Sequence, residues 1–260
     1  SYLFRAYNAH IRLDREASIE YASVRLLGRG TSILLTAGVL VEAWGFDVDA
    51  YFRKSGKQRA HLWMSGLLYW DGYASDRRVQ FGQREAPVRL GRQSTFIRWA
   101  IARELRRLDA AYPTRIGSIL EWILMRLRHA DDETEKERWT DLFFICIFVD
   151  DVGASSISDE LYDDQGREVW VVQEGRTVRQ RRAWLHYEAA IGVLKHFGHS
   201  DSEGKGITPC QERVFLGVTE CLRRQALVLE KRKRSDYCDL CKQALRGRPV
   251  QQGIAISRDA

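Results

Sequence analysis

The sequence predicts an α+β fold in which an antiparallel sheet is backed by helices on one face. Three observations predict it. Short runs of strand-forming residues and helical stretches are mixed along the chain without strict alternation, which favours α+β over a doubly wound α/β fold. Apolar residues at spacings of three and four mark separate helices. The 260 residues, 45% of them hydrophobic, are enough to bury a full core.

The first elements are predicted to be strands. The segments "SVRLLGRG" and "ILLTAGVLV" indicate two short strands separated by a turn at Gly28–Gly30, and "WGFDVDAYFRK" is a further strand that carries acids. The segment "AHLWMSGLLYWDGYASDRRVQFG" predicts a strand, a turn at Asp71–Gly72 and a second strand.

Two helices are expected next. The first begins near Ser94 and ends at Pro113, with an apolar stripe of Phe96, Ile97, Ala100, Ile101, Leu105 and Leu108. The second runs from about Arg115 to His129 on Ile116, Ile119, Leu120, Ile123 and Leu127. The charged run "ADDETEKER" indicates an exposed loop or a helix end.

The last third predicts a mixture of hairpins and helices. The segment "DELYDDQGREVWVVQEG" indicates a hairpin that turns at Asp164–Gly166. A third helix follows, with Gly198 as its stop signal and an apolar stripe of Leu185, Ala189, Val193 and Phe197. The segments "RVFLGVTE" and "ALVLEK" predict two strands, followed by a basic helix and a disordered tail after Arg248.

The charge of the chain favours a polyanionic partner. The net charge is +6 and the sequence pI is about 9.1. From Lys205 to Arg248 there are 11 Lys and Arg residues against 5 Asp and Glu residues, and a solvated helix face is the alternative explanation. No secretory pattern or membrane-spanning apolar run occurs, so we expect an intracellular protein, in the nucleus or in a cytoplasmic particle. The chain begins without Met, and we expect a fragment of a longer polyprotein.

The cysteines predict free thiols. There are five, an odd number, at Cys146, Cys210, Cys221, Cys238 and Cys241. The segment "CDLC" has zinc-ligand spacing, but a structural zinc site needs four ligands, which only Cys210 and Cys221 could complete. Two cysteines on one helix face is the favoured interpretation.

A pair of carboxylates ends an apolar strand in "FFICIFVDDVG", residues 143–153. Alternation places Ile145, Ile147 and Val149 on one face and Cys146, Phe148 and Asp150 on the other, with Asp151 at the turn. Adjacent carboxylates at the end of a buried strand repel each other and lose hydration, so a cation should offset them. No Lys or Arg occurs between Arg138 and Arg167.

A second acidic strand suggests what that cation is. Asp47 and Asp49 are two residues apart and project from one face. If the two strands are neighbours, Asp47 and Asp150 converge, and a cluster of carboxylates is best explained by divalent cations such as Mg²⁺. Two ions roughly 3.5–4 Å apart would suit phosphoryl transfer. The alternative is that these acids only cap strands at a wet sheet edge, which either motif alone would favour.

Five blocks in order resemble those of reverse transcriptases. They are "FDVDAYFRK", "VQFGQREAP", "FVDD", "SEGKGITPCQERVFLGV" and "LVLEKRKRSDY". The resemblance covers roughly residues 20 to 240, and its pattern is similar to retrotransposons of the tyrosine-recombinase (DIRS-like) type. It implies a right-hand polymerase palm with partial fingers at residues 1–46, a palm at 47–218 and a truncated helical thumb with a tail at 219–260. Finger strands would lie at about 60–82 and a charged insertion at about 129–138.

The implied activity is RNA-directed DNA polymerisation, in which a primer 3′-hydroxyl attacks a deoxynucleoside triphosphate. The implied partners are an RNA or DNA template with its primer, dNTPs and other polyprotein domains, with no membrane. The resemblance assigns Asp47 and Asp150 to both Mg²⁺ ions (Mn²⁺ is an alternative), with the Val48 carbonyl completing one shell and Asp151 in support. Lys205 would protonate the pyrophosphate, with Lys195 as its competitor.

The resemblance also assigns residues that bind the nucleotide and the primer. Phe52 would lie beneath the sugar and exclude a 2′-hydroxyl. The other nucleotide-binding candidates are Gln80, Gly82, Arg25 and Arg29, and the primer end would be held by Phe215, Leu216 and Gly217. The chain departs from the family pattern in its long gap between acids, its poorly matched finger region and its incomplete thumb, and Asp49 is an alternative to Asp47. An RNA-dependent RNA polymerase and a catalytically decayed nucleic-acid-binding remnant therefore stay open.

Overall fold

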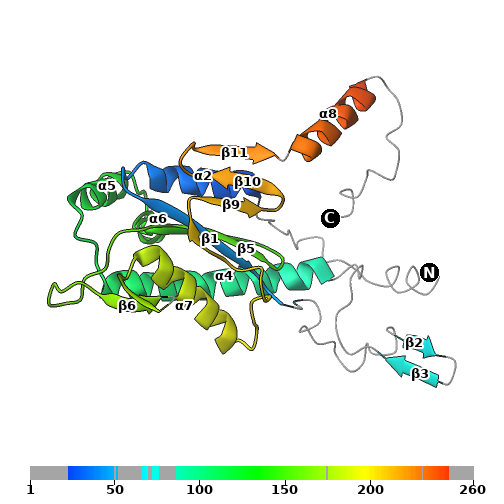
Figure 1. The fold of residues 1–260 in the computed structure, drawn as a ribbon, viewed down its shortest axis with the longest axis horizontal. Helices are drawn as coiled ribbons and strands as arrows, with labels where there is room; N and C mark the ends of the chain where they lie inside the picture. Colours follow the sequence, from blue (N-terminus) through cyan, green and yellow to red (C-terminus); the bar gives the residue numbers. More distant parts are fainter. Residues whose placement is uncertain are drawn as a thin grey trace.

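In the computed structural model of the protein, a four-stranded antiparallel sheet forms the centre of the molecule (Figure 1). The structure describes residues 23–49, 51, 66–69, 72–75, 86–173, 175–229 and 231–245. The strand order is β4-β5-β1-β8. The strands are β4 (Phe143–Phe148), β5 (Asp151–Ile157), β1 (Val41–Asp47) and β8 (Ile207–Cys210).

Helices cover both faces of this sheet, so the expectation of helices on one face is wrong (Figure 1). Helices α4 (Ala86–Ala111) and α7 (Arg182–His196) pack on one face, and α2 (Val24–Leu35) packs on the other. Strand β4 shows why: its sequence "FFICIF" is apolar at successive positions, and successive side chains point to opposite faces. Ile145 joins the core under α4, whereas Cys146 joins a cluster with Leu27 of α2.

Helix α2 replaces the two short strands expected at "SVRLLGRG" and "ILLTAGVLV". Leu27, Thr31 and Leu34 recur at helical spacing and are buried against the sheet. The Ser23 side chain caps the helix by accepting a hydrogen bond from the Leu26 amide (3.1 Å). Gly30 marks no turn: a Cβ there would lie 2.2 Å from the Phe144 ring, so glycine lets the helix approach the sheet closely.

The middle of the chain follows the expected order of elements. Strands β2 (Gly66–Tyr69) and β3 (Gly72–Ser75) form the expected hairpin. Helix α4 begins before Ser94, and α5 (Gly117–Leu127) is the second expected helix. The charged run forms α6 (Glu133–Trp139), because the Asp132 side chain caps the Glu135 amide at 2.7 Å.

The turn expected at Asp164–Gly166 is present: the Gly166 amide donates to the Asp163 carbonyl oxygen (3.0 Å), and an antiparallel bridge joins Tyr162 to Glu168. A further hairpin follows, with strands β6 (Trp170–Gln173) and β7 (Arg176–Arg179), and Gly175 adopts a φ of 75° before β7. Helix α7 ends before Gly198 as expected, but its buried stripe is displaced by one position. The buried residues are Arg182, Ala183, His186, Tyr187, Ala190 and Leu194.

A three-stranded sheet of order β11-β10-β9 follows, and its outer strand leads to α8 (Lys231–Leu245). The strands are β9 (Glu212–Phe215), β10 (Val218–Cys221) and β11 (Ala226–Leu229). The segment "RVFLGVTE" is thus a hairpin and not one strand, because Leu216 and Gly217 both have positive φ (48° and 74°). Cys238 and Cys241 lie exposed on α8 and all five thiols are free. No helix among the described residues is long and apolar enough to span a membrane.

Candidate active site

The structure brings the acids of the two motifs together at one end of the central sheet. Strands β1 and β5 pair antiparallel, and their register sets Asp47 opposite Asp151. The Val48 amide donates a hydrogen bond to the Asp150 carbonyl oxygen (2.9 Å), which extends this pairing into the turn. Three carboxylates from two distant segments of the chain therefore share the same sheet end.

The turn between β4 and β5 holds a strained residue. Val149 has a φ of 58°, a left-handed conformation that is costly for a β-branched side chain. The hydroxyl of Ser94 on α4 donates to the Val149 carbonyl oxygen (2.7 Å), and the Tyr51 hydroxyl lies 3.1 Å from the Ser94 oxygen. Helix α4 thus fixes the backbone immediately before Asp150. Val149 was expected to continue the strand on the face of Ile145 and Ile147. Strand β4 instead ends at Phe148, because the chain turns at Val149.

Burial and mutual repulsion raise the pKa values of two of the acids. Burial raises the pKa of Asp151 to about 6, with further increases from the charges of Asp150 and Asp47. Burial also raises the pKa of Asp150, and the nearby charge of Asp47 adds to that increase. Lys205 lowers both pKa values but does not offset the other contributions. The site therefore carries more negative charge than the described side chains neutralise.

Lys205 supplies the cation that no neighbouring segment of sequence offered. Its ammonium forms a short hydrogen bond and ion pair with Asp47 Oδ2, and that contact raises the pKa of Lys205. The loop after α7 carries Lys205 to this position. Its Ser202 amide donates to the Asp47 carbonyl oxygen (2.7 Å) and its Ser200 carbonyl oxygen accepts from the Asp49 amide (2.8 Å). The Lys205 side chain is 65% exposed, so the ammonium remains in contact with solvent.

The carboxylates at this end of the sheet suit Mg²⁺ better than they suit a metal ion whose ligands all come from the protein. Among the described residues, no three His, Cys, Asp or Glu side chains form a ready metal-binding group. Mg²⁺ does not need one, because it usually takes one or two carboxylates and completes its octahedron with water and substrate phosphates. Hard oxygen donors with excess negative charge are present at Asp47, Asp150 and Asp151. The same finding leaves the four-cysteine zinc site unformed in the described part of the chain.

Two of the nucleotide-binding candidates line a cavity that Asp47, Asp150 and Asp151 do not line. Arg25 and Arg29 are exposed on α2 and line a cavity of about 410 Å³ shared with residues of β10 and β11. The other three candidates, Phe52, Gln80 and Gly82, lie outside the described residues. Lys195 is exposed near the end of α7.

The three primer-end candidates have different environments. Phe215 is buried against Leu27 of α2, and its ring contacts the backbone of β5 at Gly153, where a Cβ would lie 2.7 Å from the ring. Leu216 and Gly217 form the exposed turn of the β9–β10 hairpin. The hairpin is thus anchored to an acid-bearing strand through Phe215, while its turn stays accessible.

Arg213 was missed in the sequence and connects this hairpin to the acid-bearing strands. Its buried guanidinium donates to the carbonyl oxygens of Trp44 on β1 and Ala154 on β5. It also forms an ion pair with buried Glu220 on β10 (2.7 Å). The signal was present, because alternation in "ERVF" puts Arg213 on the same inward face as Phe215.

A second missed network fastens α4 and α7 to the sheet. Buried Arg182 forms ion pairs with Asp159 (2.5 Å) and Asp109 (2.6 Å). His186 lies 3.0 Å from both Asp109 Oδ1 and the Ser156 hydroxyl of β5. These groups lie within the interface between the helices and the sheet, so their role is to fix that packing.

Comparisons with known proteins give weak structural likenesses and no sequence match. No known family and no curated protein matches the sequence. Among solved structures, a foamy viral protease–reverse transcriptase in complex with an RNA/DNA hybrid is 13% identical to this chain, with a TM-score of 0.47. The alignment covers 90% of this chain and 22% of that protein, so the chain spans less than a quarter of that protein's length.

Proposed function

We propose that this chain is the catalytic core of an RNA-directed DNA polymerase of a retroelement, which transfers a nucleotide from a dNTP to a primer 3′-hydroxyl. The observation that carries the proposal is the register of β1 and β5, which sets Asp47 opposite Asp151, the residue that follows Asp150 in the chain. The five sequence blocks that resemble reverse transcriptases supply the reaction class, because clustered carboxylates alone would suit several phosphoryl transfers.

Asp47, Asp150 and the carbonyl of Val48 would hold the Mg²⁺ ions. When bound, two such ions would neutralise charge on the attacking and leaving oxygens. Asp151 supports the pair by adding negative charge beside Asp150. The exposed ammonium of Lys205 lies at this cluster and is the candidate to donate a proton to the leaving pyrophosphate.

The rest of the chain positions these groups. Ser94 holds the turn before Asp150, and Arg213 holds the β9–β10 hairpin against the strands that carry the acids. In the proposal this hairpin carries the primer end, with Phe215 as its buried anchor and Leu216 and Gly217 at its turn. Such positioning is a large part of catalysis in phosphoryl transfer.

Primer extension on an RNA template tests this proposal. With Mg²⁺ and dNTPs we expect extension by the unmodified chain and none by Asp150→Asn. The matched control is Asp164→Asn, which makes the same change of charge at an exposed position outside the site. Extension that survives Asp150→Asn contradicts the site. Incorporation of NTPs alone indicates an RNA polymerase, and template binding without extension indicates a decayed remnant.

A further inference from the structure

A groove follows the outer edge of β4, away from the acid cluster. Strand β4 is the last strand of the central sheet, and a cavity of about 660 Å³ opens beside it between α2, α4 and α6. Phe143, Phe144 and Ile145 of β4 line it. Asp47, Asp150 and Asp151 do not line this groove. The groove is therefore distinct from the acid cluster, although Thr95 on its α4 wall directly follows Ser94, which holds the turn before Asp150.

The walls of this groove carry four arginines and one carboxylate. Arg106 binds Asp141 through two hydrogen bonds of 2.7 and 2.8 Å, which satisfies that acid. The other three, Arg98, Arg126 and Arg138, form no ion pair within the described part of the chain. Burial lowers the pKa of Arg126, and the charge of nearby Asp141, which is already bound by Arg106, offsets only part of that effect. The excess positive charge favours a polyanion.

Aromatic rings lie between these cations. Arg126 lies over the rings of Trp122 (4.4 Å) and Trp139 (5.4 Å), and Trp139 lines the groove. On the opposite wall, the Trp99 ring is 53% exposed and Arg103 lies 5.5 Å above its centre. An indole left this exposed beside guanidinium groups is typical of surfaces on which nucleic-acid bases stack.

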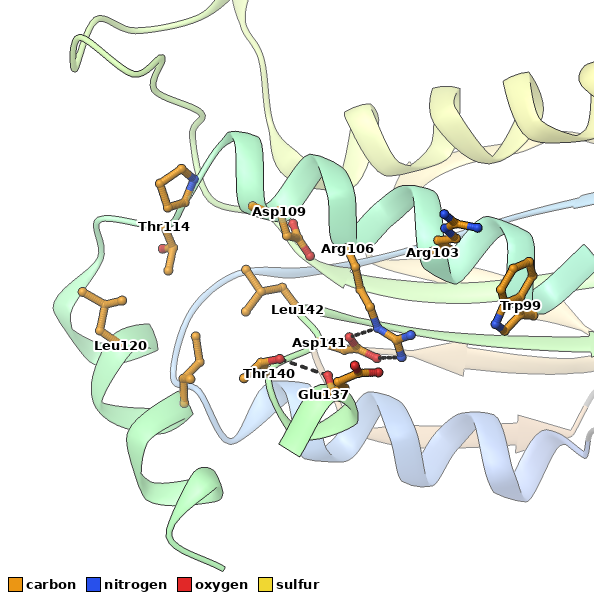
Figure 2. Close-up of a pocket in the computed structure, with 13 residues that line it drawn as sticks. Trp99, Arg103, Arg106, Asp109, Thr114, Leu120, Glu137, Thr140, Asp141 and Leu142 are labelled. Atoms are coloured by element: carbon orange, nitrogen blue, oxygen red, sulfur yellow. Dashed lines mark hydrogen bonds and ion pairs between the residues drawn. The ribbon is translucent and has the colours of Figure 1, made fainter. Parts of the chain in front are cut away.

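The aromatic surface extends beyond the groove on the outside of α4. Phe96 stacks on Trp99 with ring centres 6.0 Å apart, and Phe197 of α7 meets Phe96 edge to face at 5.2 Å. A neighbouring cavity has a volume of about 620 Å³ and shares Trp99, Arg106 and Asp141 with the groove. Figure 2 shows the residues that line this second cavity. The paired Arg106 and Asp141 therefore line both hollows.

We propose that this groove binds single-stranded nucleic acid, with Arg98, Arg126 and Arg138 at phosphates and Trp99 and Trp139 stacked on bases. Guanidinium groups that form no ion pair among the described residues alternate here with accessible indole rings, which favours this occupant over an acidic peptide added to the outer edge of β4. A peptide would use the strand edge and the cations but would leave the exposed rings without a partner. The site lies outside the acid cluster, so it goes beyond the proposed polymerase activity and does not depend on it.

Binding of a labelled 12-nucleotide oligouridylate, followed by fluorescence anisotropy in EDTA, tests the charged part of the groove. The Asp150→Asn chain is used throughout, so that catalysis does not enter. We expect the double variant Arg98→Gln/Arg138→Gln to reduce the slope of log affinity against log salt by about 0.7 for each arginine removed. The control Arg176→Gln/Arg223→Gln removes two exposed arginines outside the groove and should leave the slope of log affinity against log salt unchanged.

Trp99→Ala tests the stacking part, and we expect a loss of affinity of roughly fivefold or more. Photocrosslinking with a 5-iodouracil oligonucleotide should label peptides that contain Trp99 or Trp139. Crosslinks found only in α8 would overturn the proposal. Arginine and tryptophan variants that bind the oligonucleotide as tightly as the control variant, with the same salt dependence, would also overturn it. So does a poly-glutamate peptide whose binding is lost in these variants while oligonucleotide binding is unchanged. We expect each variant to fold, because the substituted side chains of Arg98, Arg138 and Trp99 are exposed. Thermal unfolding checks this.

Discussion

Asp47 faces Asp151 across paired antiparallel strands, and the only ammonium group shown at these two acids in the described part of the chain is that of Lys205. Like charges in register on neighbouring strands are destabilising. The fold retains them at the end of a sheet whose interior is otherwise apolar. Residues that cost stability and have no packing role are candidates for function.

Removing one of these acids should stabilise the chain without metal. We expect Asp151→Asn to raise the free energy of unfolding by about 1 kcal/mol, because repulsion with Asp47 and Asp150 is relieved in a partly solvated site. The same variant should lose most of the stabilisation that added Mg²⁺ gives the unmodified chain. Thermal unfolding with and without Mg²⁺ measures both effects. A lower melting temperature in EDTA, with an unchanged Mg²⁺ response, would show that Asp151 is only a structural polar residue.

Lys205 should affect the chemical step more than binding. If its ammonium donates the proton to pyrophosphate, Lys205→Gln lowers the single-turnover rate by about 10²-fold or more and leaves template affinity within a few fold. Lys205→Arg keeps the charge at Asp47 but donates a proton poorly, so its single-turnover rate should stay close to that of Lys205→Gln. Lys195→Gln serves as the matched control. Equal losses in the Lys195 and Lys205 variants would rule out this assignment.

Arg213 should be among the most costly residues to replace. Arg213→Ala leaves Glu220 buried without its partner, and we expect a loss of about 3–5 kcal/mol in the free energy of unfolding. The double variant Arg213→Met/Glu220→Met removes both charges and should recover much of that loss. Urea unfolding of the single and double variants measures the coupling. Additive losses would mean that the ion pair does not hold the hairpin in place.

Much of this arrangement follows from local sequence patterns. The apolar run before Asp150 and the acids of the second motif predicted two strands ending in carboxylates, and alternation predicted which side chains share a face. The helices α4, α5 and α7 were predicted because their apolar spacing is long and regular. These signals depend only on residues near one another in the chain.

The missed features depend on contacts between distant segments. Helix α2 contains Gly28 and Gly30, which locally indicate a turn, yet Gly30 is required because the ring of Phe144 lies against it. Lys205 was named as a site residue through the resemblance, but its ion pair with Asp47 was not predicted, because it forms only where the loop after α7 pairs with the residues that follow β1. The partners of Arg213 are likewise backbone oxygens of two other strands. Local patterns carry no information about such pairings.

Tyr51 provides a test of how α4 packs beside the acid cluster. Burial raises the pKa of its phenol to about 12, so the folded state favours the neutral form more strongly than the unfolded state does. The unfolded chain therefore loses this proton from about pH 10, and the folded chain does so only near pH 12. Stability attributable to Tyr51 should be constant below pH 10 and fall by about 1–3 kcal/mol as the pH rises through this window. Urea unfolding between pH 8 and pH 11 should show the fall in the unmodified chain and a smaller one in Tyr51→Phe. Because the Tyr51 hydroxyl contacts Ser94, which holds the turn before Asp150, equal pH profiles in the two chains would contradict this buried contact.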